Sequence, residues 1–141
     1  MLTEDQVTEA VCEHLRAHHW TIVSRAMGKT PGVDVVAERQ EARLEIEAKG
    51  AGSSDLGSSR YGHSFTRGNV FTHVGEAVLK ALRVIAADRA HAAIAFPDNH
   101  DHRAEVELVR PALQRLGIIV FWVQEDGTVQ TGGTNMLWLS C

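Results

Sequence analysis

Charged side chains alternate with apolar ones along one short stretch of this chain. Glu45, Glu47 and Lys49 are spaced two residues apart, and Asp34 lies in the apolar run that precedes them. Two carboxylates held a few ångströms apart repel each other, and a hard divalent cation such as magnesium, which prefers oxygen ligands, relieves the repulsion. A lysine beside that cation can orient or help to deprotonate a water and can stabilise charge on a phosphoryl oxygen. Metal-assisted hydrolysis of a phosphodiester needs these residue types close together.

Two strands, predicted at residues 33–38 and 43–49, would bring these side chains together. Both alternate apolar and polar residues, and the link at 39–42 is short enough for an antiparallel hairpin. If Glu38 faces Arg43, a favourable charge pair, then facing residues have numbers that add up to 81, and Asp34 faces Glu47. Both carboxylates and Lys49 then share one face, and we expect the apolar opposite face to be core. The alternative interpretation is an ordinary solvated strand face carrying an ion pair.

The rest of the chain predicts a mixed α/β layer fold around a central sheet, with the order α-β-β-β-α-β-α-β. Residues 50–67 are rich in glycine and serine and predict a long loop, and residues 97–102 predict a second loop. Helical periodicity and apolar runs indicate the other elements. These are helices at 3–18, 71–90 and 104–116, the last disturbed or restarted at Pro111, strands at 20–25, 92–96 and 118–123, and a terminal pair at 129–130 and 136–139.

Composition limits the classes of protein that are possible. The chain has 141 residues, 44% hydrophobic and 23% charged, which is typical of one globular domain over residues 1–141 and excludes collagen-like repeats and disorder. Its apolar runs are far shorter than the roughly 20 residues of a membrane span, so we expect no membrane partner. Cys12 and Cys141 are too few for a disulfide framework, which favours a reducing, cytoplasmic location.

The hairpin motifs resemble those of a nuclease superfamily. The runs Gly32-Val33-Asp34-Val35-Val36-Ala37 and Leu44-Glu45-Ile46-Glu47-Ala48-Lys49-Gly50, with a helix before and a long helix after, are similar to the PD-(D/E)XK nucleases. The resemblance covers roughly residues 3–96 and implies a single restriction-endonuclease-like domain with an αβββαβ core. It also implies that Asp34 and Glu47 are ligands of Mg (or Mn) and that Lys49 is the catalytic lysine. Val33 stands where the superfamily's name has proline.

Members of this superfamily often add a metal-binding glutamate from the first helix. At 100° per residue, Glu4 lies about 60° from Val7 on the face expected to meet the sheet, whereas Glu9 points to the opposite side. We therefore predict Glu4 as the third metal ligand. Glu9 is the alternate, because the spacing to the following strand in some members favours it. A first-turn acid such as Glu4 also has a purely structural interpretation, which is that it complements the helix dipole.

Nucleic acid is the partner that these features favour, with DNA preferred. The formal net charge of −4 is the wrong sign for bulk electrostatic binding, so contacts must come from a local patch. His73 and Lys80 lie seven residues apart on one stripe of a predicted helix, where they could contact phosphate, although a solvated helix edge is an equally simple interpretation. Arg60 and Arg67 in the long loop are predicted to contact phosphate as well.

Two functions are consistent with these observations. The first is an Mg-dependent endonuclease acting on DNA, with specificity supplied by a homodimer, a partner protein or DNA shape, because no separate recognition module is present. The second is a non-catalytic nuclease-fold module that binds or assembles within a larger complex, which the acidic net charge and small size favour. Retention of Asp34, Glu47 and Lys49 favours the enzyme, because a module that does not cut has no need of two repelling carboxylates beside a lysine.

Overall fold

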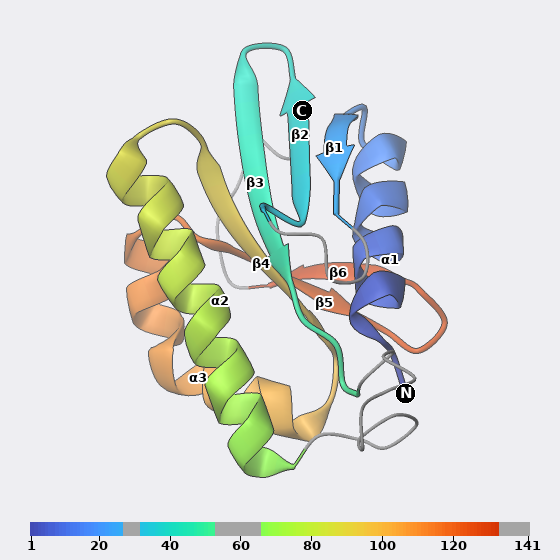
Figure 1. Cartoon of the computed structure of the whole chain (residues 1–141), viewed down its shortest axis with the longest axis vertical. Helices are drawn as coiled ribbons and strands as arrows, with labels where there is room; N and C mark the ends of the chain where they lie inside the picture. Colours follow the sequence, from blue (N-terminus) through green and yellow to red (C-terminus); the bar gives the residue numbers. More distant parts are fainter. Residues whose placement is uncertain (27–31, 53–65, 133–141) are drawn as a thin grey trace.

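The chain folds into a mixed β-sheet with helices packed on both faces (Figure 1). The computed structural model describes residues 1–26, 32–52 and 66–132. In these residues the strands lie side by side in chain order, with the inner pairs β3–β4 and β4–β5 parallel and the outer pairs antiparallel. The strands are β1 (Thr21–Arg25), β2 (Val35–Arg39), β3 (Ala42–Ala48), β4 (His91–Pro97), β5 (Ile119–Val123) and β6 (Val129–Gly132).

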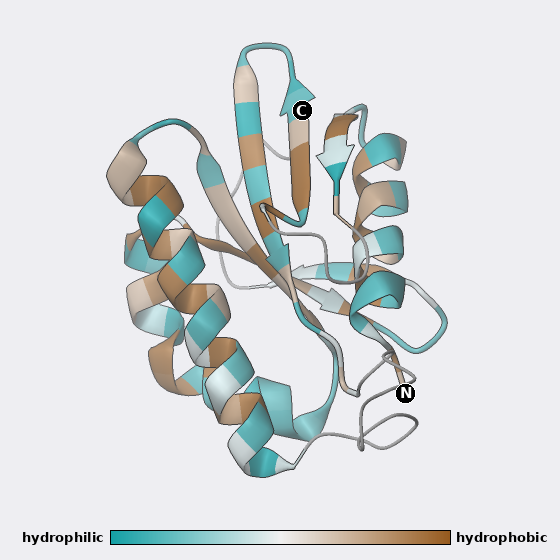
Figure 2. Ribbon diagram, in the orientation of Figure 1, coloured by the Kyte–Doolittle hydropathy of each residue, from teal (hydrophilic) through white to brown (hydrophobic). Residues whose placement is uncertain are grey.

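The helices divide the apolar side chains into two cores. Helix α1 (Glu4–Ala17) covers one face of the sheet, and α2 (Arg67–Ala87) and α3 (His100–Arg115) cover the other (Figure 1). Because successive strand residues point to opposite faces, β4 contributes Ala93 and Ala95 to the α1 core, and Ile94 and Phe96 to the other core. Apolar and polar residues alternate along β3 (Figure 2).

The first helix forms where its sequence signals place it. The Thr3 side chain accepts a hydrogen bond from the Gln6 amide, and the Gln6 side-chain oxygen accepts one from the Thr3 amide, which together form a capping box. Val7, Val11 and Leu15 repeat at helical spacing and are buried against the sheet. This packing holds the first turn of α1 in place, and the site described below depends on that position.

Both boundaries of helix α2 differ from the sequence prediction. Helix α2 begins at Arg67 rather than at residue 71, because Thr66 and Asn69 form a second capping box that the sequence reading missed. It ends at Ala87, and Asp88 then adopts a left-handed conformation. Arg67 is therefore helical and does not belong to a loop.

Helix α3 also starts earlier than predicted. Its N-cap is Asn99, so part of the predicted loop at 97–102 is helical, and the helix runs through Pro111 without a restart. Val106 and Leu113 are buried on either side of Pro111, and this packing keeps the helix continuous despite the missing amide. The predicted order of elements is otherwise confirmed, and the predicted strand at 136–139 lies outside the described residues.

Candidate functional site

The β2–β3 hairpin has the register that its charge pattern predicts. Val35 faces Ile46 and Glu38 faces Arg43, so every pair adds up to 81, and the turn is made at Gln40, whose φ is 55°. Asp34 comes just before β2, and its Oδ2 accepts a hydrogen bond of 2.8 Å from the amide of Ala48. Asp34 is therefore held against the carboxyl end of β3.

The side chains of Asp34 and Glu47 meet on the α2 side of this hairpin. Both are buried, with 9% and 7% of their surface exposed, and they share a hydrogen bond. Burial raises the pKa of Asp34 to about 7, and the charges of Glu47 and Glu4 act in the same direction, while the Ala48 amide opposes them. A buried carboxyl group whose pKa is raised, next to a second buried carboxyl group, is a place where a divalent cation can replace a proton.

Glu4 reaches this region because the start of α1 touches the end of β3. Thr3 bridges to Gly52, and the Ala51 amide donates a 2.7 Å hydrogen bond to the carbonyl of Leu2. A side chain at Gly50 would place its Cβ 2.4 Å from the Glu4 amide nitrogen, so only glycine allows this approach.

Glu4 interacts electrostatically with the charged residues of the hairpin. Burial raises the pKa of Glu4, the charge of Glu47 adds to this increase, and the charges of Lys49 and Lys80 oppose it. Glu9, the alternate candidate, instead forms an ion pair with Arg25 of β1. Glu4 is therefore the first-helix carboxylate that lies with the hairpin residues.

Three ion pairs connect β3 to α2 and its C-terminal end. Glu45 accepts two hydrogen bonds of 2.9 Å from Arg89, and Glu47 Oε2 lies 2.8 Å from Lys80 Nζ. Lys49 Nζ lies 3.0 Å from Glu76 Oε2 and 3.6 Å from Glu47 Oε2. We call these three contacts the β3–α2 ion pairs. They cover the polar face of β3 with charges of the opposite sign.

The interpretation of this face as an ordinary solvated surface is wrong for the strand residues. The side chains of Glu45, Glu47 and Lys49 are only 1%, 8% and 10% exposed. Helix α2 lies over them, and burying such charges is costly unless they are paired. The β3–α2 ion pairs meet that requirement, and the Lys80 hydrogen bond to Glu47 raises the pKa of Lys80.

The residues predicted to contact nucleic acid fall in different places. Lys80 lies at the carboxylates, and half-buried His73 lies one turn before Glu76, whose pKa its charge helps to lower. Arg67 instead pairs with Glu105 and Asp101 of α3, at 3.4 and 3.6 Å, and so is engaged away from the hairpin. Arg60 lies outside the described residues.

Three charged residues near the hairpin were not predicted from the sequence. Glu76 and Arg83 lie on the same stripe of α2 as Lys80, spaced four residues before it and three residues after it, and Arg89 follows the helix. Helical spacing from Lys80 would have found Glu76 and Arg83. Arg89 had no such signal, because its contact with Glu45 depends on how the chain turns after α2.

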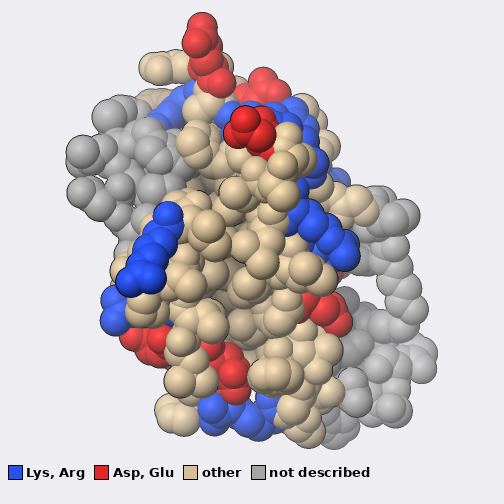
Figure 3. All heavy atoms as spheres, turned by 90° about the vertical axis from the view of Figure 1, so that its left-hand side faces the viewer, with Lys and Arg blue, Asp and Glu red and all other residues tan. Residues whose placement is uncertain are grey.

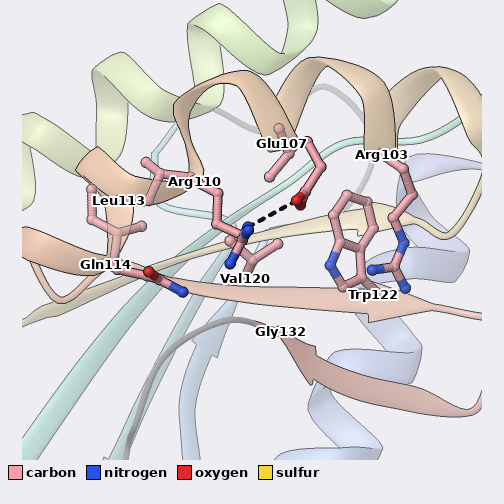
Figure 4. Close-up of a pocket in the computed structure, with 10 residues that line it drawn as sticks. Arg103, Glu107, Arg110, Leu113, Gln114, Val120, Trp122 and Gly132 are labelled. Atoms are coloured by element: carbon pink, nitrogen blue, oxygen red, sulfur yellow. Dashed lines mark hydrogen bonds and ion pairs between the residues drawn. The ribbon is translucent and has the colours of Figure 1, made fainter.

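A hollow of about 300 Å³ opens beside Glu47, between the hairpin and α2. Its charged lining residues are Glu45, Glu47, Lys80, Arg83 and Arg89, and we call it the Arg83 hollow. A second hollow, of about 60 Å³, lies between α3 and β5 (Figure 4). There Arg110 pairs with Glu107 and the Arg103 guanidinium lies over Trp122, so this second hollow contains no pair of carboxylates.

The carboxylate oxygens at and near the end of the hairpin are suitable ligands for a hard cation. Asp34, Glu47 and Glu4 offer carboxylate oxygens, which are the ligands that Mg²⁺ and Mn²⁺ prefer. In residues 1–26, 32–52 and 66–132, no three acidic, histidine or cysteine side chains already surround one metal position. Glu47 is bonded to Lys80 and Asp34 to the Ala48 amide, so a metal ion would have to displace the Lys80 ammonium.

Comparison of the chain with protein-family models, with curated proteins and with solved structures gives no match. Among the described residues, none of the helices has the length and apolar character needed to cross a bilayer. The arrangement of the β2–β3 hairpin, α1 and α2 is therefore the basis on which a function has to be argued.

Proposed function

We propose that this protein is a metal-dependent nuclease that hydrolyses phosphodiester bonds in DNA. The observation that carries the proposal is the meeting of Asp34 and Glu47 at the end of the hairpin, with Lys49 beside them and with Glu4 near enough to interact electrostatically with Glu47 and Lys49. The order of elements around this hairpin agrees with the αβββαβ core that the sequence resemblance implies. The restriction-endonuclease-like classification of the domain is part of the same proposal.

The residues divide into two roles. Asp34, Glu47 and Glu4 would hold Mg²⁺ or Mn²⁺, which when bound would polarise a phosphoryl oxygen and lower the pKa of a bound water. Lys49 follows directly after β3, and its buried ammonium lies 3.6 Å from Glu47 Oε2. We assign Lys49 to orienting the attacking water or to stabilising charge on the phosphoryl oxygen. Glu76 holds the Lys49 ammonium by a 3.0 Å contact and so fixes its direction.

A cleavage assay tests the proposal. Labelled linear, nicked, branched and single-stranded DNA, together with RNA of the same sequence, is incubated with Mg²⁺ or Mn²⁺ and separately with a chelator. We expect metal-dependent cleavage of at least one DNA substrate, and a loss of at least a hundredfold in rate for Asp34→Asn, Glu47→Gln and Lys49→Ala. Glu107→Gln on α3, which changes an exposed ion pair away from the site, is the matched control and should cleave normally.

The outcomes separate the two candidate functions. Cleavage that Lys49→Ala leaves at the wild-type rate would remove the lysine from the mechanism and with it the most specific part of the assignment. DNA binding without cleavage under every metal condition would favour the alternative, a non-catalytic binding or assembly module. Cleavage of RNA in preference to DNA would change the proposed substrate and leave the site intact.

A homodimer would let two such sites act on the two strands of a duplex. Helices α2 and α3 expose a row of apolar side chains on the face away from the sheet, and Figure 3 shows this face with charged groups mainly toward its edges. The row contains Phe71, Leu79, Leu82, Leu108, Val109 and Leu116.

We propose that a second copy of the chain covers this face. A two-fold contact brings identical surfaces together, which a face with an uncharged centre permits without like-charge repulsion. The exposed apolar residues span positions 71–82 on α2 and 108–116 on and just after α3, which at about 1.5 Å per residue gives a patch about 12–17 Å long and two helices wide. The apolar patch is smaller than the roughly 800 Å² per partner of a stable interface, so the contact has to include the polar residues around it.

A further inference from the structure

The Arg83 hollow continues directly from the candidate active site. Glu47 and Lys80 line it and also form the central β3–α2 ion pair, so a molecule bound at Asp34 and Glu47 would extend into the hollow without leaving the surface. Its volume of about 300 Å³ is at the lower end of the range for ligand pockets, which leaves room for a group the size of one nucleotide.

The charged side chains that line the hollow include more cations than anions. Arg89 neutralises Glu45 through a bidentate contact, to which Arg43 adds a 3.1 Å bond, and Lys80 neutralises Glu47. Arg83 is exposed, and no residue of the described part of the chain forms an ion pair with it. Within residues 1–26, 32–52 and 66–132, the Arg83 guanidinium therefore has no counter-ion, and it can bind an anionic ligand.

The spacing along α2 places Arg83 on the same side of the helix as Lys80. Arg83 follows Lys80 by three residues, which is about 4.5 Å along a helix axis, and both side chains line the hollow. A nucleic-acid strand carries one phosphate per nucleotide, so a strand whose scissile phosphate lies at Asp34 and Glu47 would bring a neighbouring phosphate toward Arg83. A guanidinium can also bind a phosphate through two parallel hydrogen bonds.

We propose that the Arg83 hollow binds a backbone phosphate of the nucleic-acid strand, next to the phosphate that is cleaved, with Arg83 as its ligand. This inference rests on the proposed function, because it takes its position from a scissile phosphate at Asp34 and Glu47. A phosphate contact carries no information about the base sequence. The hollow would therefore position the strand and add to the binding affinity without adding sequence specificity. Arg89 stays with Glu45 and forms the far wall of the hollow.

Binding measurements on Arg83→Ala test this inference. Labelled DNA is titrated into the full chain with Ca²⁺ in place of Mg²⁺, at several salt concentrations, and anisotropy gives Kd. We expect Arg83→Ala to weaken binding about five- to tenfold and to reduce the salt slope by somewhat less than one, as the loss of one phosphate contact does. Arg83→Lys should recover part of the affinity. Arg110→Ala, an exposed arginine paired on α3, is the matched control and should bind like the wild type.

A phosphate scan then locates the contact. Single phosphates of the DNA are replaced one at a time by uncharged methylphosphonates. Wild type should lose affinity at one position within two nucleotides of the cleaved bond, and Arg83→Ala should show no further loss at that position. Equal losses in both proteins at every position would overturn the inference, as would a wild-type Kd for Arg83→Ala. Competition by a free nucleoside monophosphate as strong as that by the strand would assign the hollow to free nucleotide instead.

Failure of this inference is distinguishable from failure of the proposed function. Metal-dependent cleavage by the wild type, with Arg83→Ala indistinguishable from it in binding and in the phosphate scan, would overturn only the role of the hollow. Binding that depends on Arg83 in a protein that never cleaves would overturn only the nuclease. Absence of any nucleic-acid binding would overturn both. Because Arg83 is exposed, the Arg83→Ala protein should melt at the wild-type temperature. That measurement shows that the variant is folded.

Discussion

Lys80 Nζ lies 2.8 Å from Glu47 Oε2, so an ammonium group from α2 neutralises the strand carboxylate that we propose as a metal ligand. A cation bound at Glu47 has to compete with Lys80. Lys80→Gln should therefore tighten Mn²⁺ binding without DNA, by up to about fivefold, since an ion pair with one partner half exposed is worth at most about 1 kcal/mol. Isothermal titration calorimetry measures this affinity, and Lys80→Arg, which keeps the charge, should bind Mn²⁺ like the wild type. Weaker Mn²⁺ binding by Lys80→Gln would mean that Lys80 supports the metal site.

The proton on Asp34 should compete with metal ions. Its pKa is about 7 in the folded protein and close to 3.8 when unfolded, so between these values the folded state holds the extra proton. The contribution of Asp34 to stability is present below pH 4 and is lost as pH rises through 7. Metal binding removes that proton, so the rise in melting temperature caused by Mg²⁺ should be larger at pH 8 than at pH 6.

Thermal melts of wild type and Asp34→Asn across pH 5.5–8.5, with and without millimolar Mg²⁺, measure this effect. Asp34→Asn should show no metal-induced rise at any pH. A wild-type rise that is the same at pH 6 and pH 8 would contradict the link between this carboxyl group and the metal.

Gly50 should be sensitive to the smallest substitution. In Gly50→Ala the new Cβ would lie 2.4 Å from the Glu4 amide nitrogen and 2.7 Å from the Thr3 carbonyl carbon, both of them backbone atoms. The start of α1 has to move, which should lower the free energy of unfolding by about 1–3 kcal/mol and carry Glu4 away from the hairpin. Gly75→Ala is the control, since nothing lies near its Cβ and α2 should gain up to about 1 kcal/mol. Urea unfolding of both variants is the measurement, and a Gly50→Ala protein as stable as Gly75→Ala would contradict the close contact.

His102 should make the fold sensitive to acid. Its side chain is fully buried against Phe96, its Nδ1 lies 2.8 Å from Asn99 Oδ1, and burial lowers its pKa to about 4. The unfolded chain binds the proton near pH 6.5, so this contribution to stability is present above pH 6.5 and is lost as pH falls to 4. The loss is at most about 3 kcal/mol, at 1.36 kcal/mol per pKa unit. In urea unfolding at pH 4.5, 5.5 and 7, His102→Phe should show a flatter pH dependence, and an unchanged slope would exclude His102 as the cause.

The exposed apolar face of α2 and α3 should hold two chains together. Sedimentation equilibrium of the wild type should give twice the chain mass at micromolar concentration, and Leu79→Glu combined with Leu108→Glu should give the mass of one chain. Val23→Glu, which places a charge at an exposed apolar position on β1, is the control and should remain a dimer. A wild-type protein that sediments as one chain at every concentration would remove the proposed interface.

The hairpin was predictable because its information is local. A charge pair beside a short link specifies the register of β2 and β3, and alternation then assigns each residue to a face. The capping box of α1 and the apolar stripe of α2 were equally readable. The start of α2 was predictable as well, because Thr66 and Asn69 form a capping box directly after the glycine-rich stretch.

The surroundings of the hairpin were not predictable in the same way. Glu76 and Arg89 reach Lys49 and Glu45 only because β3 and β4 pair in parallel, which turns α2 back across the sheet. Periodicity reports which face of α2 is apolar but not which strand its charged edge will meet. The burial of Glu45, Glu47 and Lys49 follows from that tertiary contact, and a single sequence contains no signal for it.

The packing of α1 has a consequence for synthesis of the chain. Although α1 is made first and supplies Glu4, the core that holds it includes Ile119, Phe121 and Val123 of β5. A chain emerging from the ribosome thus carries Asp34, Glu47 and Lys49 well before α1 has its full docking surface. The docking of α1, and with it the position of Glu4 beside the hairpin, therefore depends on residues as late as Val123, so a chain truncated before β5 would lack part of the core that holds α1.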